Sequence, residues 1–389
     1  MSEKKRISEK ISDLNLKNIL AYLIRNPKGV ARTELCKNLH VSFPAVSSNV
    51  KKLMEQGLVL EEEQQLENGS VGRNPKIICL NKEYGIVVAV HVGYKTVEIS
   101  LLNMMSSVIY RRDFEISKRV AFEELINILT NEISEALSVI SLTYDTENLV
   151  GVSIALPGII DNETSKLMSS KFYNWQDVDL PDSIKINGYE TNLYWENDSN
   201  VLASGIFYKN PELENILAFY MGVGIGIGIF INKKLYSGSR GMAGEMGNIT
   251  FPMGEETVSL EKFISEESLV SFARENLGIE NQSFTETLKM MDDRFDDKKV
   301  RENLKIVSNY VGNFFAILLR AFDPQKIAFD GTVVRNCPNL SKMIADKLMG
   351  FTDISEDQIC IANGNENTII KGLYSITVGK SLGLEEFGG

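Results

Sequence analysis

Four glycines alternate with bulky apolar residues near the middle of the chain, at Gly222, Gly224, Gly226 and Gly228. Alternate residues of a strand share a face, so one face of this segment carries no side chains. Bare backbone of this kind can approach a phosphate or a sugar closely. The Gly-Lys-Ser/Thr ending of a P-loop is absent, and Ile227 stands where a dinucleotide-binding motif needs glycine. A ligand site and a purely structural hairpin therefore both stay open.

Three carboxylates stand where they can bind hydroxyl groups. Asp198 directly follows a predicted strand over 192–195, and strand ends of α/β folds face the crevice where ligands collect. There it can accept a hydroxyl hydrogen bond or act as a base, although a solvated turn is the alternative. Glu245 lies in the glycine-rich segment 241–248. Glu261 stands at a predicted helix start, where a simple stabilising charge is the alternative role.

Histidine and cysteine are too sparse for a structural metal centre. The chain has only His40 and His91, and none of its four cysteines forms a Cys-x-x-Cys pair. Zinc sites and disulfide frameworks both require closely spaced ligands. We therefore expect no metal and no disulfide framework.

The elements that must position these residues form two repeats. Residues 85–93, 96–102 and 108–114 predict strands, 121–142 an amphipathic helix, and 149–156 another strand. This β-β-β-α-β order matches one lobe of the actin-like ATPase fold, in which two lobes flank a cleft. A second lobe is predicted from four later segments: strands over 216–220 and 225–231, a helix over 300–322 and a strand over 327–330. The last helix, over 367–382, is expected to return to the first lobe.

The first 81 residues predict a different kind of domain. Helices are expected over 16–26 and 33–39, and a third begins at Ser42 with Pro44 in its first turn. Its inward face is expected to hold Val46, Val50, Leu53 and Met54, and its outward face Phe43, Ser47, Ser48, Asn49 and Lys51. Gly57 ends this helix, and a hairpin over 59–80 follows. This is the layout of a winged helix-turn-helix.

Charge is distributed unevenly between head and body. Residues 1–81 carry 13 Lys and Arg against 9 Asp and Glu, whereas the remainder carries 28 against 43, giving the chain its net charge of -11. Phosphate repels an acidic body, so only the head is expected to face DNA. A helical dimerisation module is the alternative, but its outer face would be apolar. The predicted DNA-binding residues are Ser42, Phe43, Pro44, Ser47, Ser48, Asn49, Lys51, Arg73 and Lys76.

In this order, the segments resemble the ROK family of sugar-responsive repressors and sugar kinases, in particular its xylose-repressor branch. The resemblance rests on GVARTELCKNLHVSFPAVSSNVKKLMEQGLV, GRNPKIICLN, GVSIALPGIID, WENDSN and GVGIGIGIFINKKLYSGSRGMAGEMGN. It implies an α/β chain with a winged helix-turn-helix over 1–81 and a two-lobed, ribonuclease H-like sugar-kinase fold. The first lobe would be 82–195 plus 368–389, and the second 196–367.

The resemblance also implies roles for single residues. Asn197 and Asp198 would bind sugar hydroxyls, with Asp198 equivalent to the base of a kinase, and Gly222 to Gly228 would hold a vestigial phosphate loop. The implied sugar-binding set is Asn197, Asp198, Glu245, Asn248, Glu261, Pro157 and Gly158.

Several departures from the family pattern disfavour catalysis. His91 replaces the aspartate that organises magnesium, and Lys95 fills a threonine position. Asn248 replaces a histidine that binds zinc and touches sugar in relatives, and the zinc cysteines are missing. Residues 329–332 stand where relatives have a Gly-Gly turn near adenosine. We therefore expect no zinc, no Mg-ATP and no enzyme activity.

The sequence thus predicts a transcriptional regulator of carbohydrate metabolism, which we expect to act as a repressor. Its partners would be double-stranded operator DNA and a small sugar in the cleft between the lobes. Half-site geometry predicts a homodimer or a dimer of dimers. No segment is long and apolar enough for a membrane span, and the polar N-terminus lacks a signal core, so a cytoplasmic protein is expected. Two alternatives remain: a sugar kinase with an accessory head, and a regulator whose degenerate body responds to a protein partner.

Overall fold

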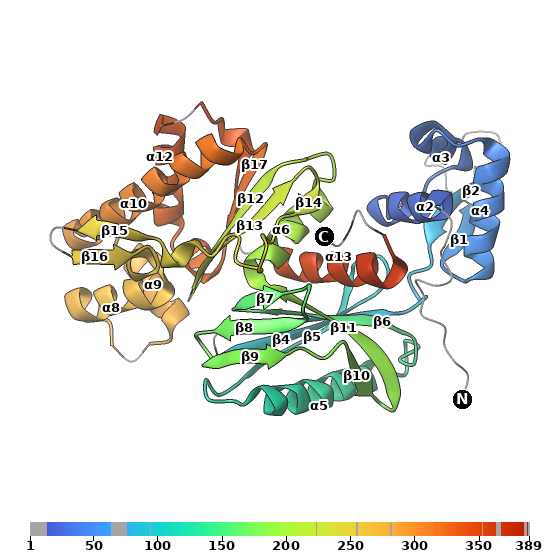
Figure 1. The fold of residues 1–389 in the computed structure, drawn as a ribbon, viewed down its shortest axis with the longest axis horizontal. Coiled ribbons are helices and arrows are strands. Elements are labelled where there is room, and N and C mark those ends of the chain that lie inside the picture. Colours follow the sequence, from blue (N-terminus) through green and yellow to red (C-terminus); the bar gives the residue numbers. More distant parts are fainter. Residues whose placement is uncertain are drawn as a thin grey trace. The chain divides into compact units, whose positions relative to one another are not determined.

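The head consists of three helices and a hairpin, described in a computed structural model of the chain. The helices are α2 (Leu14–Arg25), α3 (Arg32–Leu39) and α4 (Phe43–Glu55), and the antiparallel hairpin pairs β1 (Val59–Glu63) with β2 (Lys76–Leu80) (Figure 1). A bridge between Val30 and Ile78 ties the connection between α2 and α3 to this hairpin. The structure describes residues 14–63, 76–93, 95–222, 224–253, 256–280, 282–351, 353–362, 367–384 and 387.

Two sequence predictions for α4 are wrong. Asn49, expected on the outward face, is buried at 5% exposure, whereas Met54, expected inside, is 39% exposed. Residues three, four and seven positions after Val46 share its face of a helix, so Asn49 falls within the inward stripe with Val50 and Leu53. The helix is capped by Gln56, and Gly57 follows in the left-handed region, with φ +75°.

The described chain divides into two compact units. The first comprises the described residues of Met1–Ile154, Leu180–Trp195 and Leu373–Gly389, and the second those of Ala155–Asp179 and Glu196–Gly372. Residues 155–179, which the sequence analysis assigns to the first lobe, are therefore grouped with the second unit. Hydrogen bonds from Asn197 to the Gly158 carbonyl (2.8 Å) and from Asn162 to Glu196 (2.9 Å) hold them there.

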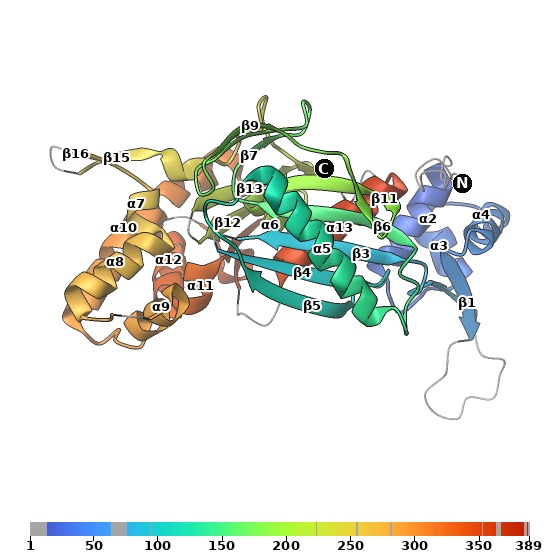
Figure 2. The same cartoon turned by 90° about the horizontal axis from the view of Figure 1, so that it is seen from below.

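The first unit is built on a six-stranded sheet with the order β10-β11-β6-β3-β4-β5. Its strands are β3 (Ile86–Val92), β4 (Thr96–Leu102), β5 (Val108–Glu115), β6 (Leu149–Leu156), β10 (Ser183–Ile186) and β11 (Tyr189–Asn197). Helix α5 (Phe122–Ile140) lies along one face of the sheet (Figure 2). The C-terminal part of α13 (Thr368–Leu382) is bound to β6 by the Ser381 hydroxyl, which donates to the Val150 carbonyl (2.9 Å).

The end of the chain contacts the head within this unit. The Phe387 ring is buried and lies 4.7 Å from the Arg25 guanidinium of α2, in a cation–π arrangement. The Phe387 carbonyl accepts a hydrogen bond from the hydroxyl of Ser375 on α13 (2.7 Å). Phe387 therefore links the head to α13.

The second unit is built on a five-stranded sheet with the order β14-β13-β12-β17-β18. Its strands are β12 (Ile216–Met221), β13 (Ile225–Ile231), β14 (Lys234–Leu235), β17 (Lys326–Asp330) and β18 (Ile359–Ile361). Two smaller sheets contain β7 (Ile159–Asp161), β8 (Lys166–Ser170) and β9 (Trp175–Asp179), and β15 (Thr250–Met253) with β16 (Glu256–Ser259). Its helices include α6 (Asp198–Lys209), α7 (Glu261–Ile264), α8 (Glu266–Leu277), α9 (Phe284–Asp292), α10 (Lys298–Phe322), α11 (Thr332–Asn336) and α12 (Pro338–Phe351); 3-10 turns cover Met246–Asn248 and Glu356–Gln358.

The alternating sequence of β13 separates the two faces of this sheet. Ile225, Ile227 and Ile229 join the apolar core formed with α8 to α12. On the other face α6 packs so closely that a Cβ atom on Gly228 would lie 2.1 Å from the Ser199 carbonyl oxygen. At Gly228 the structural interpretation of the glycine run is therefore correct, because only a residue without a side chain admits the helix.

Candidate functional site

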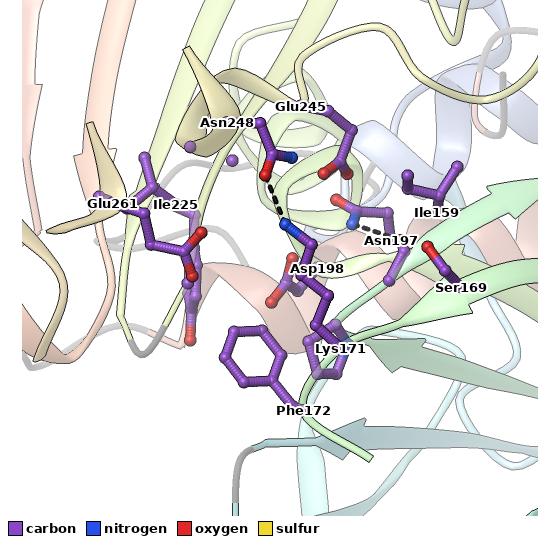
Figure 3. A pocket seen from close by; sticks show the side chains of 16 residues that line it. Ile159, Ser169, Lys171, Phe172, Asn197, Asp198, Ile225, Glu245, Asn248 and Glu261 are labelled. Atoms are coloured by element: carbon purple, nitrogen blue, oxygen red, sulfur yellow. Dashed lines mark hydrogen bonds between the residues drawn. The ribbon is translucent and has the colours of Figure 1, made fainter. Parts of the chain in front are cut away.

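The predicted carboxylates meet in one pocket of the second unit (Figure 3). The pocket encloses about 590 Å³ of space, part of it open to solvent. Every lining residue belongs to the second unit. The lining residues are Pro157, Gly158, Ile159, Ser169, Lys171, Phe172, Asn197, Asp198, Tyr220, Gly224, Ile225, Gly226, Glu245, Gly247, Asn248 and Glu261. The whole predicted sugar-binding set is thus brought together, along with two glycines of the predicted phosphate loop.

The junction between β11 and α6 positions Asn197 and Asp198. Asn197 caps α6, since its side-chain oxygen accepts from the Ser199 backbone N–H (2.8 Å), and its amide nitrogen donates to the Gly158 carbonyl (2.8 Å). Beneath it, the buried Glu196 accepts hydrogen bonds from Asn162 and Asn200, both at 2.9 Å. Asn197 is therefore held rigidly, and much of its hydrogen-bonding capacity serves the helix and the pocket floor.

Asp198 is the first residue of α6 and projects into the pocket (Figure 3). Burial, the largest cause, and the negative charge of Glu245 raise its pKa to about 7. A hydrogen bond from the Ser199 N–H (2.8 Å) opposes this rise. A carboxyl group with a pKa near neutrality can exchange a proton with a bound hydroxyl group or accept a hydrogen bond from it.

Glu245 comes from a loop fixed against β13, and Glu261 is the first residue of α7. Gly244 has φ +86° and accepts a hydrogen bond from the Ile227 N–H (2.9 Å), and a Cβ atom there would lie 1.8 Å from the Ile227 carbonyl oxygen. This glycine therefore allows Glu245 to approach the sheet. A Cβ atom on Gly247 would lie 3.2 Å from a Glu261 carboxylate oxygen, so the Gly247 backbone packs closely against the Glu261 side chain.

Both glutamates are partly desolvated. Burial raises the pKa of Glu245, and the charge of Glu261 raises it further, while Lys171 lowers it. Burial likewise raises the pKa of Glu261, and Lys171 again opposes the effect. Three acidic groups and one ammonium group thus surround a single small space, an arrangement that suits a guest rich in hydroxyl donors.

Sequence reasoning missed Lys171, Phe172 and Tyr220. The first two lie on the turn between β8 and β9, strands too short to show clear alternation. From this turn, the Lys171 ammonium donates a hydrogen bond to the Asn248 side-chain oxygen on another side of the pocket. A cluster of aromatic residues at 172, 173 and 175 around a lysine was the available signal.

The glycine run contributes little open backbone to the pocket. The ring of Tyr220 would lie 2.9 Å from a Cβ atom on Gly222, and that of Phe172 would lie 2.8 Å from one on Gly224. The Ser199 hydroxyl oxygen would lie 2.8 Å from a Cβ atom on Gly226. Gly224 and Gly226 line the pocket, whereas Gly222 and Gly228 do not. Each bare position is thus covered by a group of the chain itself.

The other departures from the family pattern lie away from the pocket lining. Asp330 is buried and binds Arg335 through two hydrogen bonds of 2.6 and 3.0 Å. His91 is half-buried on β3 of the first unit, and Lys95 is exposed beyond the end of that strand. Within the described ranges, no group of three His, Cys, Asp or Glu side chains is arranged to hold a metal ion.

The outward face of α4 is the candidate nucleic-acid interface. Phe43 is 53% exposed, Ser42, Pro44, Ser48 and Lys51 are also exposed, and Ser47 is half-buried. Ser42 occupies the N-cap position, although its side chain makes no capping hydrogen bond. Arg73, a predicted DNA-binding residue within the hairpin over 59–80 that forms the wing, lies outside the described residues. This face therefore carries a mixture of polar and aromatic groups open to a large partner.

At the base of the wing, Glu61 holds two cations. Its carboxylate accepts a hydrogen bond from Lys76 at 2.7 Å and another from Arg32. The hydrogen bond from Lys76 is the largest effect that lowers the pKa of Glu61, so this group is ionised. Lys76, predicted to contact DNA, is 46% exposed, but its positive charge is paired with the Glu61 carboxylate.

Two sequence families match the chain. The ROK family matches residues 87–375, and the family described as winged helix-turn-helix DNA-binding matches residues 12–59. The xylose repressor of Staphylococcus xylosus is 26% identical over 372 residues, which cover 93% of this chain and 94% of that protein.

Two solved structures show the same fold. A ROK family transcriptional regulator, a homolog of the Escherichia coli MLC protein, superposes with a TM-score of 0.75 at 17% identity, covering 96% of this chain and 99% of that one. The ROK family glucokinase of Streptomyces griseus, solved with glucose and AMPPNP, gives a TM-score of 0.58 at 19% identity, covering 74% and 98%. Among the residues described here, no helix is both long and apolar enough to cross a membrane.

Proposed function

The chain belongs to the ROK family, and we propose that it is a transcriptional repressor of carbohydrate metabolism whose affinity for operator DNA is changed by a bound sugar. The observation that carries this proposal is the meeting of Asp198, Glu245 and Glu261 in one pocket of a chain that also has a winged helix-turn-helix head. Carboxylates bind sugars by accepting hydrogen bonds from hydroxyl groups. Xylose is the first candidate, because a relative is named the xylose repressor.

The sugar acts by changing an equilibrium between states with different affinities for DNA. A ligand shifts such an equilibrium only by its own difference in affinity for the two states, and couplings of this kind typically change affinity by about 5- to 150-fold. The operator is double-stranded DNA read by the outward face of α4. Two heads of a homodimer would read two half-sites about one helical turn apart.

We propose further that the body does not transfer phosphate and uses neither zinc nor Mg-ATP. The support lies in the glycine run, where Tyr220, Phe172 and Ser199 cover the bare backbone that a phosphate would approach. His91 stands in place of the magnesium-organising aspartate, and histidine is a poor ligand for magnesium. On this proposal the pocket binds the sugar and does not catalyse its phosphorylation.

A sugar kinase with an accessory head is the second candidate. One observation favours it: Asp198 stands at the start of α6 with a pKa of about 7, as a general base for a sugar hydroxyl requires. Release of ADP that depends on both the sugar and Asp198 would establish this function instead.

Calorimetry and DNA binding on the full chain test the leading proposal. Xylose, glucose, galactose and mannose, with their amino and N-acetylamino forms, are titrated into the wild type, Asp198→Asn and Glu280→Gln. Glu280 is exposed and lies outside the pocket lining, so it controls for loss of a charge. We expect at least one sugar to bind the wild type and Glu280→Gln, and to bind Asp198→Asn at least about tenfold more weakly.

The DNA arm uses a duplex selected from random sequences by the wild type, with fluorescence anisotropy as the readout. The sugar that binds is expected to weaken duplex binding at least about fivefold in the wild type and Glu280→Gln. Asp198→Asn is expected to bind the duplex normally and to ignore the sugar. Silence across the whole panel, or binding of a sugar without any effect on DNA, would overturn the proposal.

A further inference from the structure

Lys171 is placed in the pocket by a well-anchored turn. The hydroxyl of Ser170 donates to the Pro157 carbonyl at 2.5 Å, and the Phe172 ring covers Gly224. Tyr173 and Trp175 are buried and stack with ring centroids 4.3 Å apart. Because the residues on both sides of Lys171 are held by these contacts, the turn keeps Lys171 at the pocket lining.

The ammonium group of Lys171 lies among acidic groups. It donates to the Asn248 side-chain oxygen, and Figure 3 shows it between the carboxylates of Glu245 and Glu261 with Asp198 nearby. Its charge acts on both glutamates. Burial raises the pKa of Glu245 and of Glu261, and the positive charge of Lys171 lowers both. Among the described lining residues, it is the only one with a positive charge.

This arrangement has an electrostatic consequence for any guest. Three carboxyl groups alone would attract cations, and a sugar carrying an ammonium group would be the preferred ligand. Lys171, which is itself exposed, already supplies one such charge, so a second ammonium group meets like-charge repulsion at short range that offsets part of this attraction. An uncharged sugar can still donate its hydroxyl hydrogens to the carboxylates.

We infer that Lys171 is a specificity-determining residue that shifts the preference of the pocket away from cationic amino sugars and toward uncharged sugars. The inference rests on the proposed sugar-binding function and names the ligand class of the same pocket. A lysine that merely lies on the surface would leave the preference between neutral and cationic sugars unchanged when it is replaced.

The test compares matched sugars by calorimetry at low salt. Xylose, glucose, galactose and mannose are each titrated as the parent, as the 2-amino-2-deoxy sugar and as its N-acetylated form. The N-acetyl form retains bulk at the same carbon without a charge, so it separates steric from electrostatic rejection. For each sugar, the measured quantity is the ratio of free-amine affinity to the affinity of the tighter of the two neutral forms.

Three variants complete the design. Lys171→Met is expected to raise the ratio of free-amine to neutral affinity at least about tenfold over the wild type. Lys171→Arg keeps the charge and is expected to keep the wild-type ratio. Lys342→Met removes an exposed lysine outside the pocket lining and is expected to change nothing.

The failures of the two proposals are distinguishable. If neutral sugars bind the wild type but Lys171→Met keeps the wild-type ratio of free-amine to neutral affinity, the inference is wrong and the proposed function stands. If no sugar in any form binds the wild type, the proposed function itself fails.

Discussion

The outward face of α4 and the pocket of the second unit present polar groups in opposite states. On α4, the side chains of Phe43, Ser48 and Lys51 stand exposed over an inner face that is fully packed. In the pocket, Asn197 is bound to three backbone groups, and Asp198 is bound to the N–H of Ser199. The first surface is completed only by a large partner, whereas the second is organised in advance around a small one.

The two regions also differ in the sign of their charge. The first 81 residues carry a net excess of basic groups, and the pocket holds three acidic groups against one ammonium. Phosphate is attracted to the head and repelled by the pocket. The difference shows that the chain uses opposite charge in the two regions, basic for DNA and acidic for a small ligand. Each prediction below tests one of these two regions.

The largest effect is expected from Asp198→Asn, through pH. An unfolded aspartate has a pKa near 3.9, whereas Asp198 in the folded chain has a pKa of about 7. The folded state therefore retains a proton that the unfolded state has lost, and this stabilisation is full below about pH 4 and disappears as the pH rises to about 7. Asparagine removes the cost of ionisation, so the variant should be more stable than the wild type at pH 8 by about 2–4 kcal/mol.

Denaturant unfolding of both proteins at pH 4.5 and pH 8 measures this difference. The gain should be much smaller at pH 4.5, where Asp198 is protonated in the folded chain. In parallel, sugar affinity of the wild type should rise between pH 6 and pH 8, because the ionised carboxylate is the stronger acceptor. A stability difference that is the same at both pH values would show that the Asp198 carboxyl is not desolvated as the pocket geometry requires.

The sequence predicted more about the elements than about the contacts between them. Eight of the eleven strands in the two large sheets and the long helix α10 were predicted, whereas the short strands β10, β14 and β18 were not. Asn197, Asp198, Glu245 and Glu261 stand near element ends that the fold brings together. Lys171 could not be found this way, because its turn lies in a small sheet of short strands. Its role depends on Asn248, 77 residues away in sequence.

Asn49 shows a second limit of sequence reasoning. A polar residue in an amphipathic helix was assigned to the exposed face by its chemistry, although its position in the helical repeat places it beside Val46 and Val50. The structure therefore corrects the expectation that Asn49 reads DNA. Helical position decided burial here, and polarity did not.

A pair of neighbouring substitutions, Ser48→Ala and Asn49→Ala, should separate DNA recognition from folding in the head. Ser48 is exposed, so its loss should weaken duplex binding by about 1 kcal/mol, the contribution of a typical hydrogen bond, without changing the unfolding midpoint. Asn49 is buried, so its loss should destabilise the head by about 1–3 kcal/mol. Anisotropy and thermal unfolding measure the two effects. Equal loss of stability in both variants would contradict the observed orientation of α4.

The smallest effect is expected at the base of the wing, from Glu61→Gln. The pairs of Glu61 with Arg32 and Lys76 are partly exposed, with the Glu61 side chain itself at 17%, so breaking them should cost at most about 1 kcal/mol of stability. The two released cations become available to phosphate, so affinity for any duplex should increase a few fold, and the salt dependence should steepen by about one to two contacts. Glu62→Gln removes the same charge from the opposite face of β1 and serves as the control. If both variants increase DNA affinity equally, the change reflects net charge alone. A larger effect at Glu61 would place the base of the wing on the DNA-binding side of the head, as the contrast with the acidic pocket requires.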